Sequence, residues 1–434
     1  MTTDNNAYIG IDIGTSGCRA IAISNQGDII AQSQHPLKHS ISLGNSNETL
    51  SEQNPHYLWS VVLTVLDEIM RSCTHADVKA ISVDATSGSV MLASDIGEAI
   101  SPILLYNDSR AVEQSKLIAS QANETTAAIG PTSGLAKLCY LEQYTTVKAP
   151  HYLLHQADWV NLQLGADIAI TDENNALKTG YDPLNRQWPD WLEELTDPNI
   201  LPKVVSAGTN IGHLSDSLCQ RFKLKTAPSL IAGTTDSIAA LIATGCTKEG
   251  DAVTSLGSTL VIKLISKQPI FLAKQGLYSH RLGNKWLIGG ASNTGGAVLK
   301  HYFTDRQLEQ LSNKIKLGES TYDYYPLLTV GERFPIFDAK LQPKMTPRPS
   351  SDLKFLHSLL QSIANIELMA YQQLQDAGTS QPNSVRTVGG GAKNKVWRTL
   401  REQTLNIPII TPEHTEAAYG SALIANGVMD KFLT

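Results

Sequence analysis

The sequence predicts an α/β fold divided into two domains, on three observations. The chain has 434 residues, and one hydrophobic core seldom serves a chain of that length. Apolar segments with strand patterns alternate with helical patterns, which is typical of α/β proteins. A strand, a glycine turn and a second strand open the chain and occur again near its middle, as two halves of similar structure would give.

The first predicted element is a meander of three strands. Residues 8–24, YIGIDIGTSGCRAIAIS, read as two apolar strands separated by the turn Gly14-Thr15-Ser16-Gly17. The turn signal NQGD follows and leads into a third strand at Ile29-Ile30-Ala31. Consecutive strands joined by short turns of this kind pair antiparallel.

Further helices and strands follow in alternation. A helical pattern covers residues 54–73, and an apolar strand follows from Val78 to Asp84. Another strand, Ser229–Ala232, leads into a helix predicted for Ser237–Thr244, with Gly245 in the role of a C-cap.

The opening hairpin has a counterpart in DAVTSLGSTLVIKLIS, residues 251–266. A chance match between two short turns is the alternative to a true duplication. If the duplication is real it is asymmetric, because only the first hairpin carries a carboxylate. The alignment pairs Gly14 with Gly257, Thr15 with Ser258, Ser16 with Thr259 and Asp12 with Ser255.

Composition excludes several classes of partner. The chain is 42% hydrophobic and 18% charged, with a net charge of −6 and no basic block, so we expect neither a nucleic-acid groove nor binding to an anionic membrane surface. Its apolar runs are shorter than the ~20 residues that a membrane span needs. The first ten residues lack a signal core, and five scattered cysteines favour reduced thiols. We expect a cytoplasmic protein that binds a small molecule.

The first glycine turn is a candidate phosphate and metal site. Glycine turns direct backbone N–H groups at an anion, and Thr15 and Ser16 add hydroxyl donors. Asp12 lies between two isoleucines in an apolar strand, where a charge needs a partner or a cleft. A carboxylate beside phosphate suits Mg²⁺ between them. A plain β-hairpin is the alternative. The sequence has neither a Walker A loop nor a G-x-G-x-x-G fingerprint.

Asp236 stands between a predicted strand and a predicted helix, in SLIAGTTDSIAALIATG. It suits the N-cap of a helix that begins at Ser237, and capping is the commoner role of such a residue. It equally suits a general base at the carboxyl end of a strand, where ligands of α/β proteins gather. The residues alone favour the cap.

A second glycine-rich turn, Gly389-Gly390-Gly391, precedes a helix predicted from about Asn394. Three glycines let a ligand approach the backbone closely. Trp397 lies beside the apolar stripe of that helix and could stack on a purine, or it could be a core residue. The later segment HTEAAYGSALIANG reads as a Thr415-capped helix packed through Ala and Gly, for which no site is needed.

Taken in order, these motifs resemble the FGGY family of carbohydrate kinases over nearly the whole chain. The matching segments are DIGTS at residues 12–16, SEQNPHYLW at 51–59, GTTDS at 233–237, SLGST at 255–259, GGASNTGG at 289–296, GGGAKNKVW at 389–397 and TEAAYGSA at 415–422. The resemblance implies two ribonuclease-H-like domains of the actin/hexokinase superfamily, with a ligand cleft between them. It implies residues 1–229 on the sugar side, residues 230–434 on the nucleotide side, and transfer of the γ-phosphoryl group of ATP to a sugar with Mg²⁺.

The resemblance also implies a role for each matching residue. Asp236 would be the catalytic base, which reverses the preference for a cap, and Asp12 would be catalytic at the Mg²⁺–phosphate centre. The sugar would contact Asp12, Ser87 and Asp236. The phosphates would lie against Gly14, Thr15, Ser16, Gly257, Ser258 and Thr259. Adenosine would be surrounded by Gly390, Gly391, Asn394 and Trp397.

The chain is shorter than most members of this family, and DATSGSV (residues 84–90) stands where D-xylulose kinases carry a Gly-Gln-Met-His-Gly type segment. This substitution resembles the compact D-ribulose kinase-type branch of cyanobacteria and plant plastids, as do TSLGST, DYYPL and GERFP. In that branch the serine at the position of Ser87 contacts the ketose. YNDSR (residues 106–110) resembles the family's sugar-side segment. We expect phosphorylation of the 5-hydroxyl of D-ribulose, with D-xylulose, glycerol or another polyol, or a non-catalytic actin-like ATP-binding protein, as alternatives.

Overall fold

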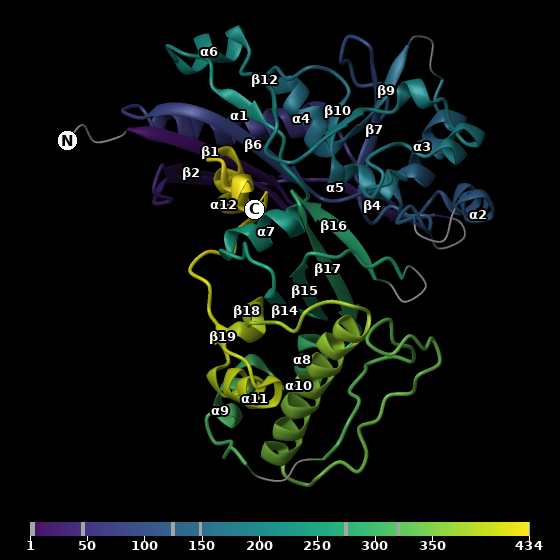
Figure 1. Ribbon diagram of the computed structural model, residues 1–434, viewed down its shortest axis with the longest axis vertical. Coiled ribbons are helices and arrows are strands. Elements are labelled where there is room, and N and C mark those ends of the chain that lie inside the picture. The colour runs from purple at the N-terminus through teal and green to yellow at the C-terminus, as the bar shows by residue number, and fades with distance from the viewer. Residues whose placement is uncertain are drawn as a thin grey trace. The chain divides into compact units, whose positions relative to one another are not determined.

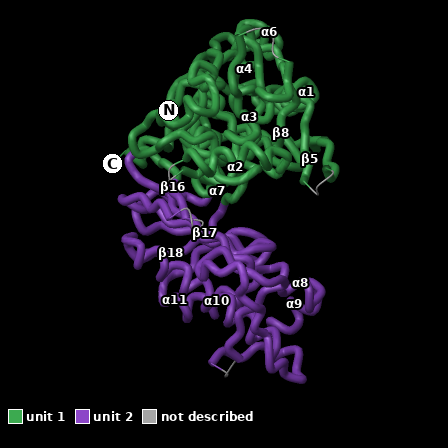
Figure 2. The backbone as a smooth tube through the Cα atoms, turned by 90° about the vertical axis from the view of Figure 1, so that its right-hand side faces the viewer, with its two compact units in different colours: residues 1–243, 280–283, 414–434 green, residues 244–279, 284–413 purple. Residues whose placement is uncertain are grey.

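The computed structural model describes residues 5–44, 48–122, 126–146, 150–272, 277–318 and 322–433. The chain forms two compact units (Figures 1 and 2). Unit 1 comprises residues 1–243, 280–283 and 414–434, and unit 2 comprises residues 244–279 and 284–413. The division expected after residue 229 stays a prediction, and the compact units separate after residue 243. Within the described ranges, no helix has the length and apolar character needed to cross a membrane.

Unit 1 contains a six-stranded sheet in the order β12-β13-β6-β1-β2-β3, a five-stranded sheet in the order β4-β5-β8-β7-β9, and the pair β10-β11. Its elements are β1 (Asn6–Ile13), β2 (Gly17–Ser24), β3 (Ile29–Pro36), β4 (Ser40–Leu43), β5 (Thr49–Gln53), α1 (Pro55–Ser72), β6 (Asp77–Ala85), β7 (Val90–Ser94), β8 (Ile103–Leu104), α2 (Val112–Gln121), α3 (Gly134–Tyr144), β9 (His151–His155), α4 (Gln156–Leu164), β10 (Ile170–Asp172), α5 (Glu173–Ala176), the 3₁₀ turns η1 (Leu177–Thr179), η2 (Asp190–Glu194), η3 (Pro198–Ile200) and η6 (Val428–Phe432), β11 (Lys203–Val205), β12 (Asn210–His213), α6 (Asp216–Phe222), β13 (Ser229–Ile231), α7 (Asp236–Ala243) and α12 (Ala417–Ala425).

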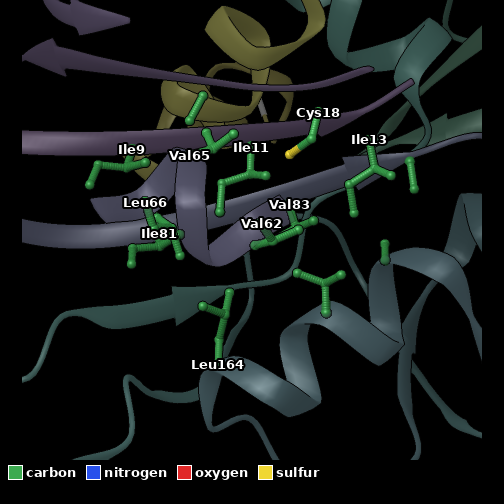
Figure 3. Close-up of a cluster of buried hydrophobic side chains, with 14 of the residues drawn as sticks. Ile9, Ile11, Ile13, Cys18, Val62, Val65, Leu66, Ile81, Val83 and Leu164 are labelled. Atoms are coloured by element: carbon green, nitrogen blue, oxygen red, sulfur yellow. The ribbon is translucent and has the colours of Figure 1, made fainter. Parts of the chain in front are cut away.

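The predicted meander is confirmed as β1, β2 and β3, which pair antiparallel. β6 pairs with β1 on its other side, in parallel. Alternation along β1 directs Ile9, Ile11 and Ile13 to one face, where Figure 3 shows them in one buried cluster with side chains of α1 and β6. Gly10 and Asp12 therefore point to the opposite face.

Helix α12 covers that opposite face by direct backbone contact. A Cβ atom at Gly10 would lie 2.0 Å from the Ala418 carbonyl oxygen, so only glycine permits this approach. A Cβ at Gly420 would lie 1.8 Å from the carbonyl oxygen of Ala239 in α7. The predicted packing through small residues is confirmed. The predicted Thr415 cap is wrong, because α12 begins at Ala417 and no side chain caps it.

Unit 2 is built on a sheet that continues from β16 (Tyr278–Leu282) in the order β16-β17-β15-β14-β18-β19. Its buried clusters join the sheet to α10 and α11. Its elements are β14 (Asp251–Leu256), β15 (Leu260–Ser266), β17 (Lys285–Ser292), α8 (Gly296–Tyr302), α9 (Asp305–Ser312), α10 (Asp352–Asp376), β18 (Ser384–Val388), the 3₁₀ turn η5 (Gly390–Lys393), α11 (Lys395–Leu405) and β19 (Ile409–Ile410).

The two sheets share one topology. In unit 1 the order β3-β2-β1-β6-β13 has three antiparallel strands followed by two that are parallel to the first. In unit 2 the order β17-β15-β14-β18-β19 has the same directions. The strand β1 therefore corresponds to β14. In each hairpin the aligned glycine, Gly14 or Gly257, directly follows the last paired residue of the first strand, as the proposed duplication requires.

Candidate functional site

Two carboxyl groups lie side by side at the carboxyl ends of the parallel strands β1 and β6. Asp12 and Asp84 are register partners in this pair. Asp12 is 4% exposed and Asp84 is fully buried. The Ser421 hydroxyl of α12 donates a 2.5 Å hydrogen bond to Asp84 Oδ2. In unit 2 the corresponding positions are Ser255 and Val388, so the equivalent place in that sheet carries no carboxyl pair.

Burial disfavours the ionised form of both groups. It raises the pKa of Asp12 to about 6, although a hydrogen bond with Asp84 and the charge of Arg19 oppose the rise. Burial and the neighbouring Asp12 raise the pKa of Asp84 well above its usual range. The carboxylate of Asp236 acts on both groups in the same direction. The three acids therefore share one electrostatic environment.

Asp236 comes to this edge through the loop after β13. Thr235 forms a parallel bridge with Ala85 at the end of β6, and Gly233 packs against the Val83 carbonyl. Helix α7 begins at Asp236 itself, and the Thr235 carbonyl accepts its first hydrogen bonds, from Ile238 and Ala239. The predicted N-cap role of Asp236 is therefore wrong: Asp236 occupies the first helical turn.

The loop between β6 and β7 carries Ser87, the residue expected to contact the sugar. Its Oγ is buried and has no hydrogen-bond partner in the part of the chain that the structure describes, and the same holds for Thr235 Oγ1. Unsatisfied buried hydroxyls are uncommon in proteins and are one sign of a missing ligand. Gly88 follows with φ +83°, a value that favours glycine.

This loop rests on a buried polar layer. The Lys137 ammonium, fully buried, donates to the carbonyl oxygens of Gly88 at 2.8 Å and Leu105 at 2.7 Å. Thr86 donates to Gln156, whose amide donates in turn to Gln53 of the SEQNPHYLW segment. The segment is thereby linked to the loop.

The YNDSR segment is held by ionic contacts. Arg110 pairs with Asp108 at 2.7 Å and with Glu52 at 2.6 Å, and Asp108 also accepts the Ser51 N–H. These contacts fix YNDSR to β5, whose last residue, Gln53, takes part in the polar layer below Ser87.

The turn of the first hairpin exposes Thr15 and Ser16 above Asp12. A Cβ at Gly14 would lie 3.8 Å from Asp12 Oδ1, which places the carboxylate directly under the turn. The Gly14 N–H closes the turn by donating to Gly17. Among the described contacts, the N–H groups of Thr15 and Ser16 donate to no backbone acceptor. Of the three residues predicted to bind phosphate at this turn, Thr15 and Ser16 are therefore the two whose N–H groups are not used by the described backbone.

The two glycine-containing turns predicted to contact the nucleotide lie together within unit 2, beside the start of α8. The carbonyls of Gly257 and Ser258 accept hydrogen bonds from Gly296 and Ala297 at the start of α8. A Cβ at Gly389 would lie 2.9 Å from the Leu256 carbonyl. Ser258 is exposed and Thr259 half-buried. A Cβ at Gly390 would meet no atom within 4 Å, so the crest of this turn is open to a ligand.

Trp397 does not present its ring to a ligand, because it is 1% exposed. Its Nε1 donates to the Leu360 carbonyl of α10, and a Cβ at Gly391 would lie 2.7 Å from its ring. The core alternative describes Trp397 correctly: it supports the glycine turn from beneath. Asn394 caps α11 by accepting the Trp397 N–H and donates to Ser312, so its amide also serves the local fold.

Two of the sequence motifs, DYYPL and GERFP, meet at the NTGG turn. Glu332 of GERFP is 3% exposed and accepts hydrogen bonds from the Ser292 hydroxyl at 2.5 Å and the Asn293 N–H at 2.7 Å. Tyr325 of DYYPL donates to the same carboxylate at 3.0 Å. These motifs thereby fix the segment that supports the Gly257–Thr259 turn.

Sequence reasoning missed Asp84 and Ser421 as site residues. Asp84 had an available signal, a carboxylate at the end of an apolar strand, as Asp12 is in β1. Ser421 had no such signal, because close packing through small residues already accounts for the sequence of its helix. The hydrogen bond between Ser421 and Asp84 joins α12 to β6 across 337 positions of the chain.

Comparison with known proteins decides the family. Models of the FGGY family of carbohydrate kinases match residues 7–243, as its N-terminal domain, and residues 252–428, as its C-terminal domain. This chain belongs to the FGGY family of carbohydrate kinases. It is an ATP-dependent carbohydrate kinase with the two-domain α/β fold of the FGGY and actin/hexokinase type, which confirms the fold predicted from the sequence.

Individual relatives are distant. The gluconokinase of Bacillus subtilis (strain 168) is 22% identical over 98% of this chain and 88% of its own. A xylulose kinase of Staphylococcus epidermidis is 24% identical over 96% of this chain and 87% of its own. The structure of a xyloylose kinase from Brucella ovis superposes with a TM-score of 0.87 at 22% identity, covering 98% of this chain and 90% of that one. At this identity the superposition establishes the fold.

FGGY kinases use ATP, generally with Mg²⁺. The described residues contain no cluster of three or more His, Cys, Asp or Glu side chains able to hold a metal. Mg²⁺ in phosphoryl-transfer sites is usually bound by one or two carboxylates, and water and phosphate supply the rest. Asp12, with Asp84 beside it under the Gly14 turn, is a donor set of that kind. The residues present therefore fit the ion.

Proposed function

We propose that this FGGY kinase transfers the γ-phosphoryl group of ATP to the 5-hydroxyl of a ketopentose, and that its preferred substrate is D-ribulose. The observation that carries the proposal is the unsatisfied hydroxyl of Ser87 at the same sheet edge as Asp12 and Asp236. The motifs around Ser87 and Glu332 support membership of the compact D-ribulose kinase-type branch. D-Xylulose is the second candidate, since a 24% identical relative is a xylulose kinase.

In this proposal Asp236 is the general base. Its carboxylate accepts the proton of the 5-hydroxyl as that oxygen attacks the γ-phosphorus, the new O–P bond forms, and the bond to the β-phosphate oxygen breaks with ADP as leaving group. Asp12 would hold Mg²⁺, which offsets phosphate charge when bound. Thr15 and Ser16 donate hydrogen bonds to the transferred group, and positioning supplies most of the rate.

The remaining assignments follow the two sequence halves. Residues 1–229 carry the sugar side, where Asp12 and Ser87 contact the acceptor and Gly14 shapes the phosphate turn. Asp236, seven residues into the second half, completes the contacts with the acceptor. Residues 230–434 carry the nucleotide side. There Gly257, Ser258 and Thr259 contact the other phosphates. Gly390, Gly391 and Asn394 border adenosine, and Trp397 supports them from the core.

All five cysteines are free, which agrees with the proposed cytoplasmic location.

The test is release of ADP from MgATP in the presence of D-ribulose, D-xylulose, glycerol or D-gluconate. We expect the highest kcat/KM with D-ribulose. A higher value with D-xylulose would refute the choice of substrate and keep the choice of reaction. Absence of stimulation by every acceptor would favour a non-catalytic ATP-binding protein.

A further inference from the structure

Two lysines lie beside the Ser87 loop, and among the described residues only Lys137 has hydrogen-bond partners. Lys137 donates to two carbonyl oxygens. Lys178 lies beside the same loop, and a Cβ at Gly88 would be 3.4 Å from its Cδ. Lys178 is half-buried, yet the described residues offer its ammonium neither a hydrogen bond nor an ion pair. The ammonium is not among the fully buried polar atoms that lack a partner, so it reaches solvent and is available to donate hydrogen bonds to a ligand bound beside the loop.

The segment that carries Lys178 is held firmly by its neighbours. Asp172 caps α5 by accepting the N–H groups of Asn174 and Asn175. At the other end, Thr179 Oγ1 lies 3.0 Å from His155 Nε2 in a buried contact. Lys178 lies in the 3₁₀ turn η1 directly after α5. Its backbone position is therefore fixed, while its ammonium has neither a hydrogen bond nor an ion pair within the described ranges.

The same segment is tied to the loop of the proposed base. The Asn174 amide donates to Thr234 Oγ1 at 3.0 Å, two residues before Asp236. It also exchanges hydrogen bonds with the backbone of Arg281. Burial lowers the pKa of Lys178, and the Asp236 carboxylate opposes that shift, so the two charges act on each other. The Lys178 side chain thus lies beside the sugar loop, on a segment that is hydrogen-bonded to the loop of the base.

We propose that Lys178 is a further substrate-contacting residue, whose ammonium donates hydrogen bonds to oxygen atoms of the acceptor sugar beside Asp236. The inference rests on the proposed function, since it names a further residue that binds the acceptor sugar of that same site. An ammonium donates hydrogen bonds to hydroxyl, ketone and carboxylate oxygens alike. The acceptor class is therefore a polyhydroxylated ketose or a sugar acid, and the two are separated by experiment.

The experiment measures binding of D-ribulose, D-xylulose and D-gluconate to the full chain by calorimetry without nucleotide, and then steady-state kinetics. Lys178→Met keeps the length of the side chain and removes the charge. We expect about 10- to 100-fold weaker binding of the sugar that the unmodified protein prefers, the range for a lost charge-assisted hydrogen bond. KM for ATP should stay within about twofold. Preference for D-gluconate in the unmodified protein, lost in Lys178→Met, would assign the ammonium to a carboxylate.

Two controls separate contact from folding. Lys203→Met removes an exposed lysine of β11 in the same unit and should leave sugar affinity unchanged. Lys178→Arg keeps the charge and should retain more affinity than Lys178→Met at an equal unfolding midpoint. Unchanged sugar affinity in Lys178→Met, or a rise confined to KM for ATP, overturns the inference alone. If no sugar binds or stimulates the unmodified protein, the proposed function fails and the inference fails with it.

Discussion

Single residues at the edge of the first sheet set how this protein responds to pH. The pKa of Asp12 is about 6 in the folded protein against 3.8 ordinarily. The folded state consequently binds more protons than the unfolded chain between pH 4 and pH 6. The contribution of Asp12 to the free energy of unfolding is present at low pH and is lost as the pH rises through this range. Asp84, whose pKa shifts in the same direction, adds to the effect.

Asp84→Asn tests this balance. Asparagine can still accept the Ser421 hydroxyl and donate to Asp12, but it removes one buried acid. We expect the free energy of unfolding to rise by about 1–2 kcal/mol at pH 8, with the gain shrinking as the pH falls towards 5. Urea unfolding at several pH values measures it. A gain that is constant with pH would contradict the pKa assignments.

Asp236→Asn separates chemistry from folding. Asp236 is in the first turn of α7, so its charge adds only about 0.3–1 kcal/mol through the helix dipole. Loss of a general base, by contrast, lowers kcat by about 10²–10⁴. We expect a nearly unchanged unfolding midpoint and the loss of sugar-stimulated ADP release. Turnover within a factor of two of the unmodified enzyme would exclude Asp236 as the base.

At the scale of elements, the contact between β1 and α12 tolerates no side chain at Gly10. Gly10→Ala would bring a methyl group to 2.0 Å from the Ala418 carbonyl, so the helix must move. We expect a loss of about 1–3 kcal/mol in the free energy of unfolding. Gly14→Ala in the same hairpin is the stability control, because its nearest contact would be 3.4 Å. Equal stability of the two variants would argue against this packing.

The pairing of α10 with α11 depends on a buried ion pair. Arg401 and Glu367 are at most 1% exposed and join through two hydrogen bonds of 2.5 and 2.6 Å. Glu367→Ala leaves the guanidinium buried without its partner, and we expect a loss of about 3–5 kcal/mol. Asp323→Ala breaks the exposed pair with Lys344 and should cost less than about 1 kcal/mol. Thermal and urea unfolding compare the two.

Local patterns in the sequence were enough to predict the hairpins and α1. A single acid in an apolar strand, as at Asp12, can be recognised from the sequence. The start of α1 can be recognised as well, because Asn54 and Pro55 are typical of a helix N-terminus and Asn54 caps the helix. What the sequence could not supply is register between distant strands. The pairing of Asp12 with Asp84 depends on the register between β1 and β6. The lack of a hydrogen-bond acceptor for Lys178 among the described residues depends on how several distant segments pack around it.

The burial of Trp397 shows the same limit from another side. Its position beside the apolar stripe of α11 left both interpretations open, and only the approach of α10 decides between them. The side chain fills space under Gly391, where a backbone without Cβ lets the indole come close. Helix periodicity gives the face of one helix but not the angle of the next one.

At the scale of the whole molecule, each unit has buried clusters of its own. We expect unfolding to depart from a single two-state transition, as is common for chains with more than one domain. Gly10→Ala should lower the transition that belongs to unit 1, and Glu367→Ala the one that belongs to unit 2. Hydrogen exchange, read separately for peptides from β1 and from α10, assigns the transitions. One transition shifted equally by both variants would show that the units unfold together.

The return of α12 to the first sheet also has a consequence in time. The Tyr419 hydroxyl donates to the Gly27 carbonyl across 392 positions, and at roughly 5–20 residues per second the ribosome needs about 20–80 s to make the chain between them. Throughout that interval α12 cannot pack on the Gly10 face of β1, and Asp84 lacks its hydrogen bond from Ser421. The strands that open the chain are thus among the first to be synthesised and among the last to be completed, which makes the nascent hairpin a natural client for chaperones.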